Sequence, residues 1–145
     1  MTDLRIRVEG SPAPMGSKVF KGVRNGRGVL VESSKAVAPW RMAVAWTAHD
    51  AAVKQGWVCA DGPVLVTVHF FLQPPQRMPK GRTRPTVKPD IDKLARSTLD
   101  ALTTAGVFKD DAQVVVLSVS KDYASERHPV GADIFVTLGA AERAS

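Results

Sequence analysis

The stretch that decides the fold runs from Asp90 to Lys121 and reads DIDKLARSTLDALTTAGVFKDDAQVVVLSVSK. Its first half predicts an amphipathic helix from Asp90 to Ala105, because apolar residues recur there at helical spacing. This stripe comprises Ile91, Leu94, Ala95, Thr98, Leu99 and Leu102. Gly106 is a typical residue for ending a helix. The segment from Gln113 to Lys121 is rich in β-branched residues and predicts a strand.

Other elements are expected on both sides of this unit. Periodicity and composition predict a half-exposed strand around Leu4, Ile6 and Val8, a short hairpin closed by Val29–Val31, a helix over Pro39–Gln55, a central strand over Val64–Leu72, and a strand over Asp133–Leu138. Ser33 and Ser34 offer caps for the first helix, and Gly56 ends it. This order predicts an α+β (mixed α/β) fold with two main helices packed on one mixed sheet, in a single domain over residues 1–145.

The composition excludes several classes of protein. No apolar run approaches the roughly 20 residues that span a membrane, and the N-terminus lacks the apolar stretch of a signal peptide. We therefore expect a cytoplasmic protein without a membrane partner. The single cysteine, Cys59, makes neither an internal disulfide nor a thiolate metal site. The net charge of +6 favours a polyanionic partner, and nucleic acid is the usual one.

The excess positive charge lies in two segments without acidic residues. The first runs from Ser17 to Gly28, and its glycines suggest a mobile hairpin or loop. The second runs from Gln73 to Pro89, and its five prolines forbid a helix. Both could follow a phosphate backbone. The alternative is a solvated linker, but a linker usually separates two domains, and neither half of this chain is large enough to need one. The DNA-binding candidates are Lys18, Lys21, Arg24, Arg27, Arg77, Lys80, Arg82, Arg84 and Lys88.

Five aspartates lie in or beside the predicted second helix, at positions 90, 92, 100, 110 and 111. Carboxylates suit Mg²⁺ or Mn²⁺, and the sequence has no cysteine–histidine cluster for zinc. A structural interpretation also stands: Asp90 and Asp92 would stabilise a helix start, and Asp110–Asp111 would form a turn. The two ends of such a helix are about 20 Å apart at about 1.5 Å per residue, which is too far to share a metal. The sequence alone does not show whether the fold brings these two groups of aspartates together.

At these residues the chain resembles the RusA family of Holliday-junction resolvases. The family pattern has D-x-D at a helix start, then D-A-L, a glycine, and D-D-A-Q-V at the next strand. Here it reads Asp90-Ile91-Asp92, Asp100-Ala101-Leu102, Gly106 and Asp110-Asp111-Ala112-Gln113-Val114. The diagnostic block covers Asp90 to Val115. The opening strand, with the glycine and prolines after it, and the basic approach to the D-x-D are also similar to family members.

The resemblance implies a homodimeric, metal-dependent endonuclease that cuts branched DNA. Its metal ligands and catalytic acids map to Asp90, Asp92 and Asp111, with Asp110 as a helper. Mg²⁺ is the expected cofactor, with Mn²⁺ as its substitute. The chain departs from the pattern twice, with Lys93 in place of asparagine and Arg96 in place of a functional lysine. An arginine does not give up a proton, so Arg96 would act electrostatically. Lys93 joins the DNA-binding candidates.

The resulting hypothesis is symmetric nicking of four-way junctions during recombination and repair, by a protein of a family often carried by phages and prophages. Two alternatives remain open. One is a non-enzymatic nucleic-acid-binding protein with structural carboxylates, and the other is a related nuclease that prefers flaps or forks. A phosphotransferase is disfavoured, because no glycine-rich phosphate loop is present.

Overall fold

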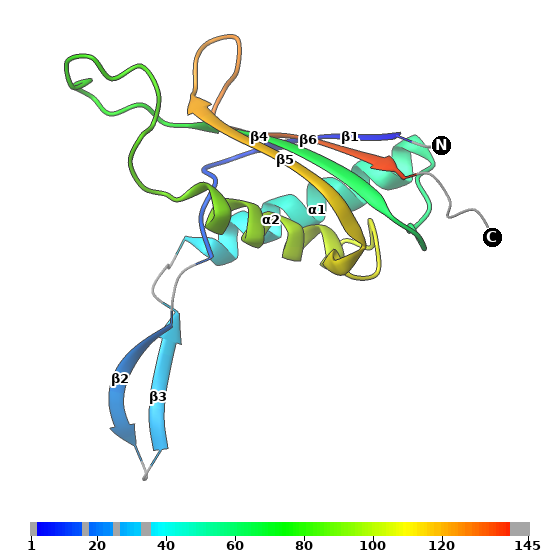
Figure 1. Ribbon diagram of the computed structural model, residues 1–145, viewed down its shortest axis with the longest axis horizontal. Coiled ribbons are helices and arrows are strands. Elements are labelled where there is room, and N and C mark those ends of the chain that lie inside the picture. Colours follow the sequence, from blue (N-terminus) through cyan, green and yellow to red (C-terminus); the bar gives the residue numbers. More distant parts are fainter. Residues whose placement is uncertain (1–2, 16–17, 25–26, 33–35, 140–145) are drawn as a thin grey trace.

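The computed structural model describes residues 3–15, 18–24, 27–32 and 36–139. The elements are β1 (Asp3–Glu9), β2 (Lys18–Arg24), β3 (Arg27–Glu32), α1 (Val37–Gln55), β4 (Val64–Leu72), α2 (Ile91–Thr104), a 3₁₀ turn η1 (Asp111–Gln113), β5 (Val114–Tyr123) and β6 (Gly131–Leu138). A four-stranded sheet and two helices form the body, and the β2–β3 hairpin projects from it (Figure 1). The predicted α+β class, sheet and hairpin are confirmed.

The sheet has the strand order β1-β6-β4-β5. β4 pairs in parallel with β5, whereas β6 is antiparallel to both β1 and β4. The parallel pair requires a crossover from one end of the sheet to the other, and α2 supplies it. β5 therefore runs back along the sheet from the end of α2 towards its start (Figure 1).

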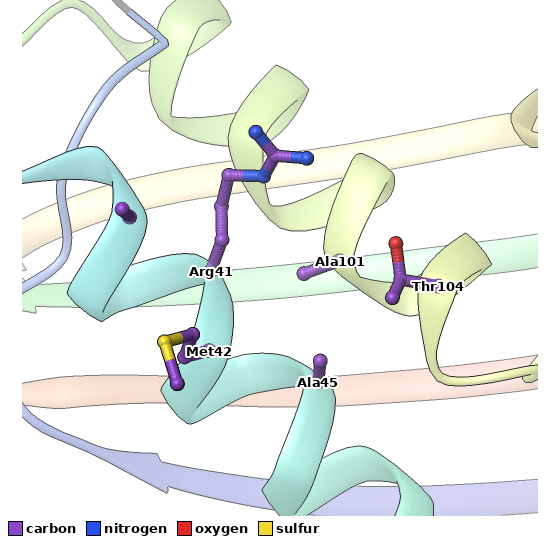
Figure 2. Close-up of a pocket in the computed structure, with 6 residues that line it drawn as sticks. Arg41, Met42, Ala45, Ala101 and Thr104 are labelled. Carbon is purple, nitrogen blue, oxygen red and sulfur yellow. The ribbon is translucent and has the colours of Figure 1, made fainter.

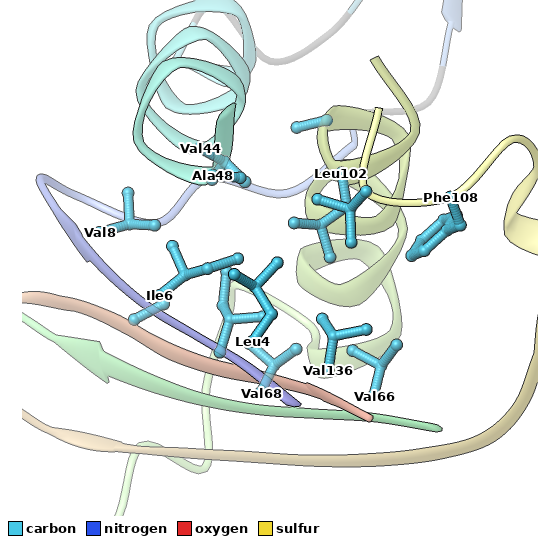
Figure 3. Close-up of a cluster of buried hydrophobic side chains, with 14 of the residues drawn as sticks. Leu4, Ile6, Val8, Val44, Ala48, Val66, Val68, Leu102, Phe108 and Val136 are labelled. Carbon is cyan, nitrogen blue, oxygen red and sulfur yellow. The ribbon is translucent and has the colours of Figure 1, made fainter. Parts of the chain in front are cut away.

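Both helices pack on one face of the sheet and enclose the hydrophobic core (Figure 3). The alternation in β1 buries Leu4, Ile6 and Val8, as expected, and leaves Arg5 exposed and Arg7 half-buried between them. The core is completed by side chains of β4, β6 and the helices, namely Val64, Val66, Val68, Phe70, Ile134, Val136, Trp40, Val44, Ala48, Leu94 and Leu102. Val107 and Phe108 are fully buried as well, so the segment after α2 is tied to the core.

Helix ends differ in detail from the sequence prediction. α1 begins after Ala36, which offers no side-chain cap, and the expected capping residues Ser33 and Ser34 lie outside the described residues. Gly56 ends α1 in the left-handed conformation, as predicted. In α2 the predicted apolar stripe is wrong at Ile91, which is 37% exposed because the helix begins there, beyond the cover of the core. In the described part of the chain, no helix is long and apolar enough to cross a membrane.

Candidate active site

The side chain of Gln113 organises the turn that follows α2. Its Oε1 accepts hydrogen bonds from the backbone N–H groups of Lys109 (2.8 Å) and Asp110 (3.0 Å). Its Nε2 donates to the carbonyl oxygens of Ala60 (2.9 Å) and Gly62 (2.8 Å). These four bonds use the full donor and acceptor capacity of the two Nε2 hydrogens and the carbonyl oxygen. The turn is thereby joined to the segment that precedes β4.

Asp110 and Asp111 follow from this geometry. The side chain of Asp110 accepts a hydrogen bond from the backbone N–H of Ala112 (2.8 Å) and forms a capping box with Gln113. The interpretation of Asp110 as a turn residue is therefore confirmed. Asp111 begins the 3₁₀ turn and has an exposed side chain. Asp110 holds the turn, whereas Asp111 remains available to a ligand.

Asp111 lies in a negative environment. Partial burial raises the pKa of its carboxyl above the ordinary 3.8, and the adjacent carboxyl of Asp110 and the charge of Asp100 add to this rise. The side chain nevertheless remains exposed to solvent. Carboxylates that repel one another at an accessible position form a local field that a cation would relieve.

These acids line an open cleft of ≈ 400 Å³ together with Arg41, Thr103, Thr104 and Lys109. Arg41 extends from α1 towards α2 above Ala101 and Thr104 (Figure 2). Lys109 forms an ion pair with Asp61, which raises the pKa of Lys109 and lowers that of Asp61. The lining of the cleft therefore combines a guanidinium with the carboxylates of the turn, a combination suited to a cation and an anion side by side.

The second acidic group lies at the start of α2. Asp90 occupies the N-cap position with extended backbone, but its side chain makes no capping hydrogen bond, and its nearest cation is Lys93 at 4.0 Å. Asp92 lies in the first turn with an exposed side chain. Arg96 is exposed one turn further on, and no ion pair joins it to Asp92 within the described residues. Both helix-start carboxylates are therefore accessible to solvent.

The basic segment from Gln73 to Pro89 leads directly into this helix start. It contains neither helix nor strand, as its prolines predicted, and it extends beyond the end of the sheet (Figure 1). Arg77, Lys80, Arg84 and Lys88 are exposed and Arg82 is half-buried. Its end is held against β5, where the ammonium of Lys121 donates to the carbonyl oxygens of Val87 (2.8 Å) and Pro89 (2.9 Å). Lys121 thus positions the backbone immediately before Asp90.

The other basic segment forms most of the β2–β3 hairpin. Lys18, Lys21, Arg24 and Arg27 belong by their backbone to the β2–β3 hairpin, and their side chains lie outside what the structure describes. The hairpin is directed away from the sheet (Figure 1). Its position is compatible with reaching a large ligand.

The structure brings Asp100, Asp110 and Asp111 together, but it does not bring Asp111 to Asp90 and Asp92 in one chain. The 14 residues of α2 separate the two groups by about 20 Å at about 1.5 Å per residue. In residues 3–15, 18–24, 27–32 and 36–139, no three His, Cys, Asp or Glu side chains are placed to hold one metal ion. The oxygen donors suit Mg²⁺, but a single chain does not assemble them around one ion.

Sequence reasoning missed two contributors to the turn and its cleft. Gln113 was recognised only as part of a pattern, although its partners Ala60 and Gly62 are 53 and 51 residues away. Arg41 carries no sequence signal at all. The proximity of Asp100 to Asp111 could have been expected, because Gly106 with φ of 80° folds the chain back beside the last helical turns.

Comparison with known proteins identifies the family of the chain. Residues 9–135 match the family model described as Endodeoxyribonuclease RusA, so the match includes both acidic groups and the basic segment. The chain is also similar to the uncharacterized protein YqaN of Bacillus subtilis (strain 168). The two are 29% identical over 136 residues, which cover 87% of this chain and 92% of YqaN.

Proposed function

Because this chain belongs to the RusA family of endodeoxyribonucleases, we propose that it resolves four-way DNA junctions by symmetric, metal-dependent nicking during recombination and repair. Membership of the family implies an endonuclease that acts on Holliday junctions. The metal, the symmetry of the cuts and the roles of individual residues are the finer parts of the proposal.

One observation carries the proposal. Two exposed carboxylates, Asp90 and Asp92, directly follow in the chain a projecting segment whose charged residues are all basic. The segment would attract the phosphate backbone, and the carboxylates would repel it. A divalent cation at the carboxylates removes this conflict and supplies positive charge where a phosphate arrives.

We assign Asp90, Asp92 and Asp111 as the ligands and catalytic acids for Mg²⁺, with Mn²⁺ as a substitute. When bound, the metal would activate water and stabilise the charge that develops on the scissile phosphate. Because one chain keeps Asp111 at the far end of α2, a metal that contacts all three carboxylates needs ligands from two copies of the chain. The alternative is that Asp90 and Asp92 hold the ion with water ligands, as Mg²⁺ sites commonly do.

The basic residues would bind and orient the DNA. Arg96, exposed on α2 one turn after Asp92, would place positive charge at the phosphate without giving up a proton. Lys93 would neutralise Asp90 in the free protein and move to a phosphate in the complex. The segment from Gln73 to Pro89 and the β2–β3 hairpin would contact the arms of the junction, mainly through their phosphates.

The proposed assembly is a homodimer. A four-way junction has approximate two-fold symmetry, and a C2 dimer presents two equivalent sites to it. Recognition would then depend on the branched shape of the DNA more than on its sequence. We place the protein in the cytoplasm, where the DNA lies, with a phage or prophage origin compatible with this function.

The test is Asp92→Asn, which keeps the size of the side chain and removes its charge. We expect the variant to bind a labelled four-way junction within about threefold of the wild type and to cut it at least 100-fold more slowly. The matched control is Asp50→Asn, an exposed aspartate on α1 that pairs with Lys54 (2.9 Å), and it should cut normally. Normal cutting by Asp92→Asn would remove Asp92 from the site.

Two competing functions are separated by further substrates. A non-enzymatic nucleic-acid-binding protein predicts tight binding with no cutting in Mg²⁺ or Mn²⁺, both before and after substitution of the aspartates. A flap or fork nuclease predicts faster cutting of those substrates than of the junction. Rates measured on all three DNA forms with one protein preparation distinguish these functions.

A further inference from the structure

An apolar groove runs between α1 and α2 beside the acidic cleft. It consists of two adjoining hollows of ≈ 220 Å³ and ≈ 290 Å³, which share Met42, Ala45 and Thr104 as lining residues. Ala45 and Ala101 point into the space between the two helices (Figure 2). Because the alanine side chain ends at Cβ, these two positions leave open a space that larger side chains would fill.

The end of the groove that is farther from the cleft exposes a tryptophan. Trp46 lines the second hollow and is 71% exposed, and Met42, one turn earlier on α1, is 60% exposed. The other two tryptophans of the chain, Trp40 and Trp57, are buried. An exposed aromatic ring offers a flat π face on which the base of a nucleic acid can stack.

The nearer end of the groove meets the acidic cleft at Arg41. This half-buried side chain lines both the first hollow and the cleft that contains Asp111. Among the described residues, no ion pair engages its guanidinium, which is a strong donor to phosphate. Arg41 lies five positions before Trp46 on α1, a rise of about 7.5 Å at about 1.5 Å per residue. The two side chains can therefore contact the phosphate and the base of one nucleotide.

We propose that the groove binds a single unpaired base of the DNA substrate, with Trp46 stacked on the base and Arg41 bound to its phosphate. The inference rests on the proposed function, because it takes branched DNA as the ligand, and it adds a site for bases that are freed from the duplex near the branch. A base within an intact duplex must first be unpaired and unstacked, so the site favours DNA in which this has already happened.

The observations favour a base over a protein partner as the occupant. Neither hollow exceeds the roughly 300–1,000 Å³ typical of sites that enclose a drug-sized ligand, so each has room for one planar ring system. Only a few residues line the groove, whereas a specific protein interface uses about 20–30 residues on each side. The guanidinium between the groove and the cleft and the net charge of +6 also suit a ligand that joins an apolar ring to an anion.

The first test measures how strongly the protein prefers an unpaired base. The probes are a DNA duplex with a one-nucleotide bulge and the same duplex with an abasic site at the bulge, which keeps every phosphate and lacks only the base. Binding is measured in EDTA, so that metal-dependent cutting does not interfere. We expect the wild type to bind the base-containing probe at least about fivefold more tightly, since the stacking of one base on an aromatic side chain typically has at least this effect.

Variants assign the preference to the groove. Trp46→Ala should abolish it, and Trp46→Phe, which keeps an aromatic ring, should retain most of it. Arg41→Gln should weaken the binding of both probes by a similar factor, because it removes a phosphate contact and leaves the stacking surface. Ala45→Leu fills the space between the helices and should abolish the preference as well. The matched control is Val53→Ala, at a 69% exposed position of the same helix, which should bind both probes like the wild type.

Tryptophan fluorescence provides a second readout. Because Trp40 and Trp57 are buried, Trp46 dominates the response of the emission to quenchers in solution. We expect the base-containing probe to quench the emission and to protect Trp46 from acrylamide, and the abasic probe to have a much smaller effect. Circular dichroism and thermal unfolding check that each variant folds.

The outcomes separate this inference from the nuclease proposal. Equal binding of the two probes by the wild type, binding of neither, or an unchanged preference in Trp46→Ala overturns the inference, and the last is the result expected if the groove serves a protein partner. Metal-dependent nicking of a four-way junction in those cases leaves the proposed function standing. A base preference that depends on Trp46, without any cutting in Mg²⁺ or Mn²⁺, supports the inference and counts against the nuclease alone.

Discussion

The substitution Gln113→Ala tests whether one side chain holds the acidic turn. It removes four hydrogen bonds, two accepted from Lys109 and Asp110 and two donated to Ala60 and Gly62. A typical hydrogen bond contributes about 1 kcal/mol net, and Gln113 is half-exposed, so water would replace part of the loss. We expect the free energy of unfolding to fall by about 2–3 kcal/mol.

The assay is urea unfolding at one fixed protein concentration, because dimer formation would make stability depend on concentration. With an m-value of about 2 kcal/mol per molar, the midpoint should fall by roughly 1–1.5 M. The control Gln55→Ala removes two hydrogen bonds to Arg5 at the exposed edge of β1 and should cost about 1 kcal/mol or less. If the urea midpoint of Gln113→Ala lies within about 0.5 M of the wild-type midpoint, the turn does not depend on this amide and the reasoning fails.

Three further predictions follow from single contacts. Lys121→Met removes two charge-assisted hydrogen bonds to Val87 and Pro89, so it should lower the free energy of unfolding by about 1–2 kcal/mol and slow junction cutting. Unchanged cutting would show that the position of Asp90 does not depend on these bonds. Thr98→Val leaves the buried Trp40 indole N–H without its acceptor (3.2 Å) and should cost about 1–3 kcal/mol in chemical unfolding; a neutral effect would mean that the hydrogen bond contributes nothing. Asp111→Asn, measured in EDTA, should raise the thermal midpoint at pH 7. The pKa of Asp111 is raised above its ordinary value of 3.8, so at pH values above the pKa the ionised carboxylate destabilises the folded state. That gain should shrink as pH falls towards and below 3.8, where the carboxyl is protonated in both folded and unfolded states, and a gain that grows with acidity would contradict the sign.

Much of the fold could be read from local patterns. The alternation of Leu4, Ile6 and Val8 with charged residues sufficed for β1, and the spacing from Leu94 to Leu102 sufficed for α2. The pattern failed at Ile91 because periodicity describes a helix face but not how far the sheet extends beneath it. The parallel pairing of β4 with β5 and the edge position of β5 are properties of topology, and strand composition does not report them.

The candidate residues of the site could be chosen from the sequence, whereas their arrangement in space could not. The aspartates are recognisable in the sequence because they cluster in a basic chain. The prolines before Asp90 predict a basic segment without regular secondary structure. The separation of Asp111 from Asp92 follows from the length of α2, which the sequence predicts, but the sequence does not show whether another part of the fold brings the two residues together. The roles of Gln113 and Lys121 depend on backbone carbonyls distant in sequence, so only the folded chain reveals them.

The most direct test of the account incubates the wild-type protein with an end-labelled four-way junction or a linear duplex, in Mg²⁺, Mn²⁺ or EDTA. The account predicts paired nicks at symmetric positions in the junction that require a divalent metal, with little cutting of the duplex. Tight junction binding without nicks in either metal would contradict it and would support a nucleic-acid-binding protein, with Lys93 and Arg96 as the first residues to restore to the family pattern.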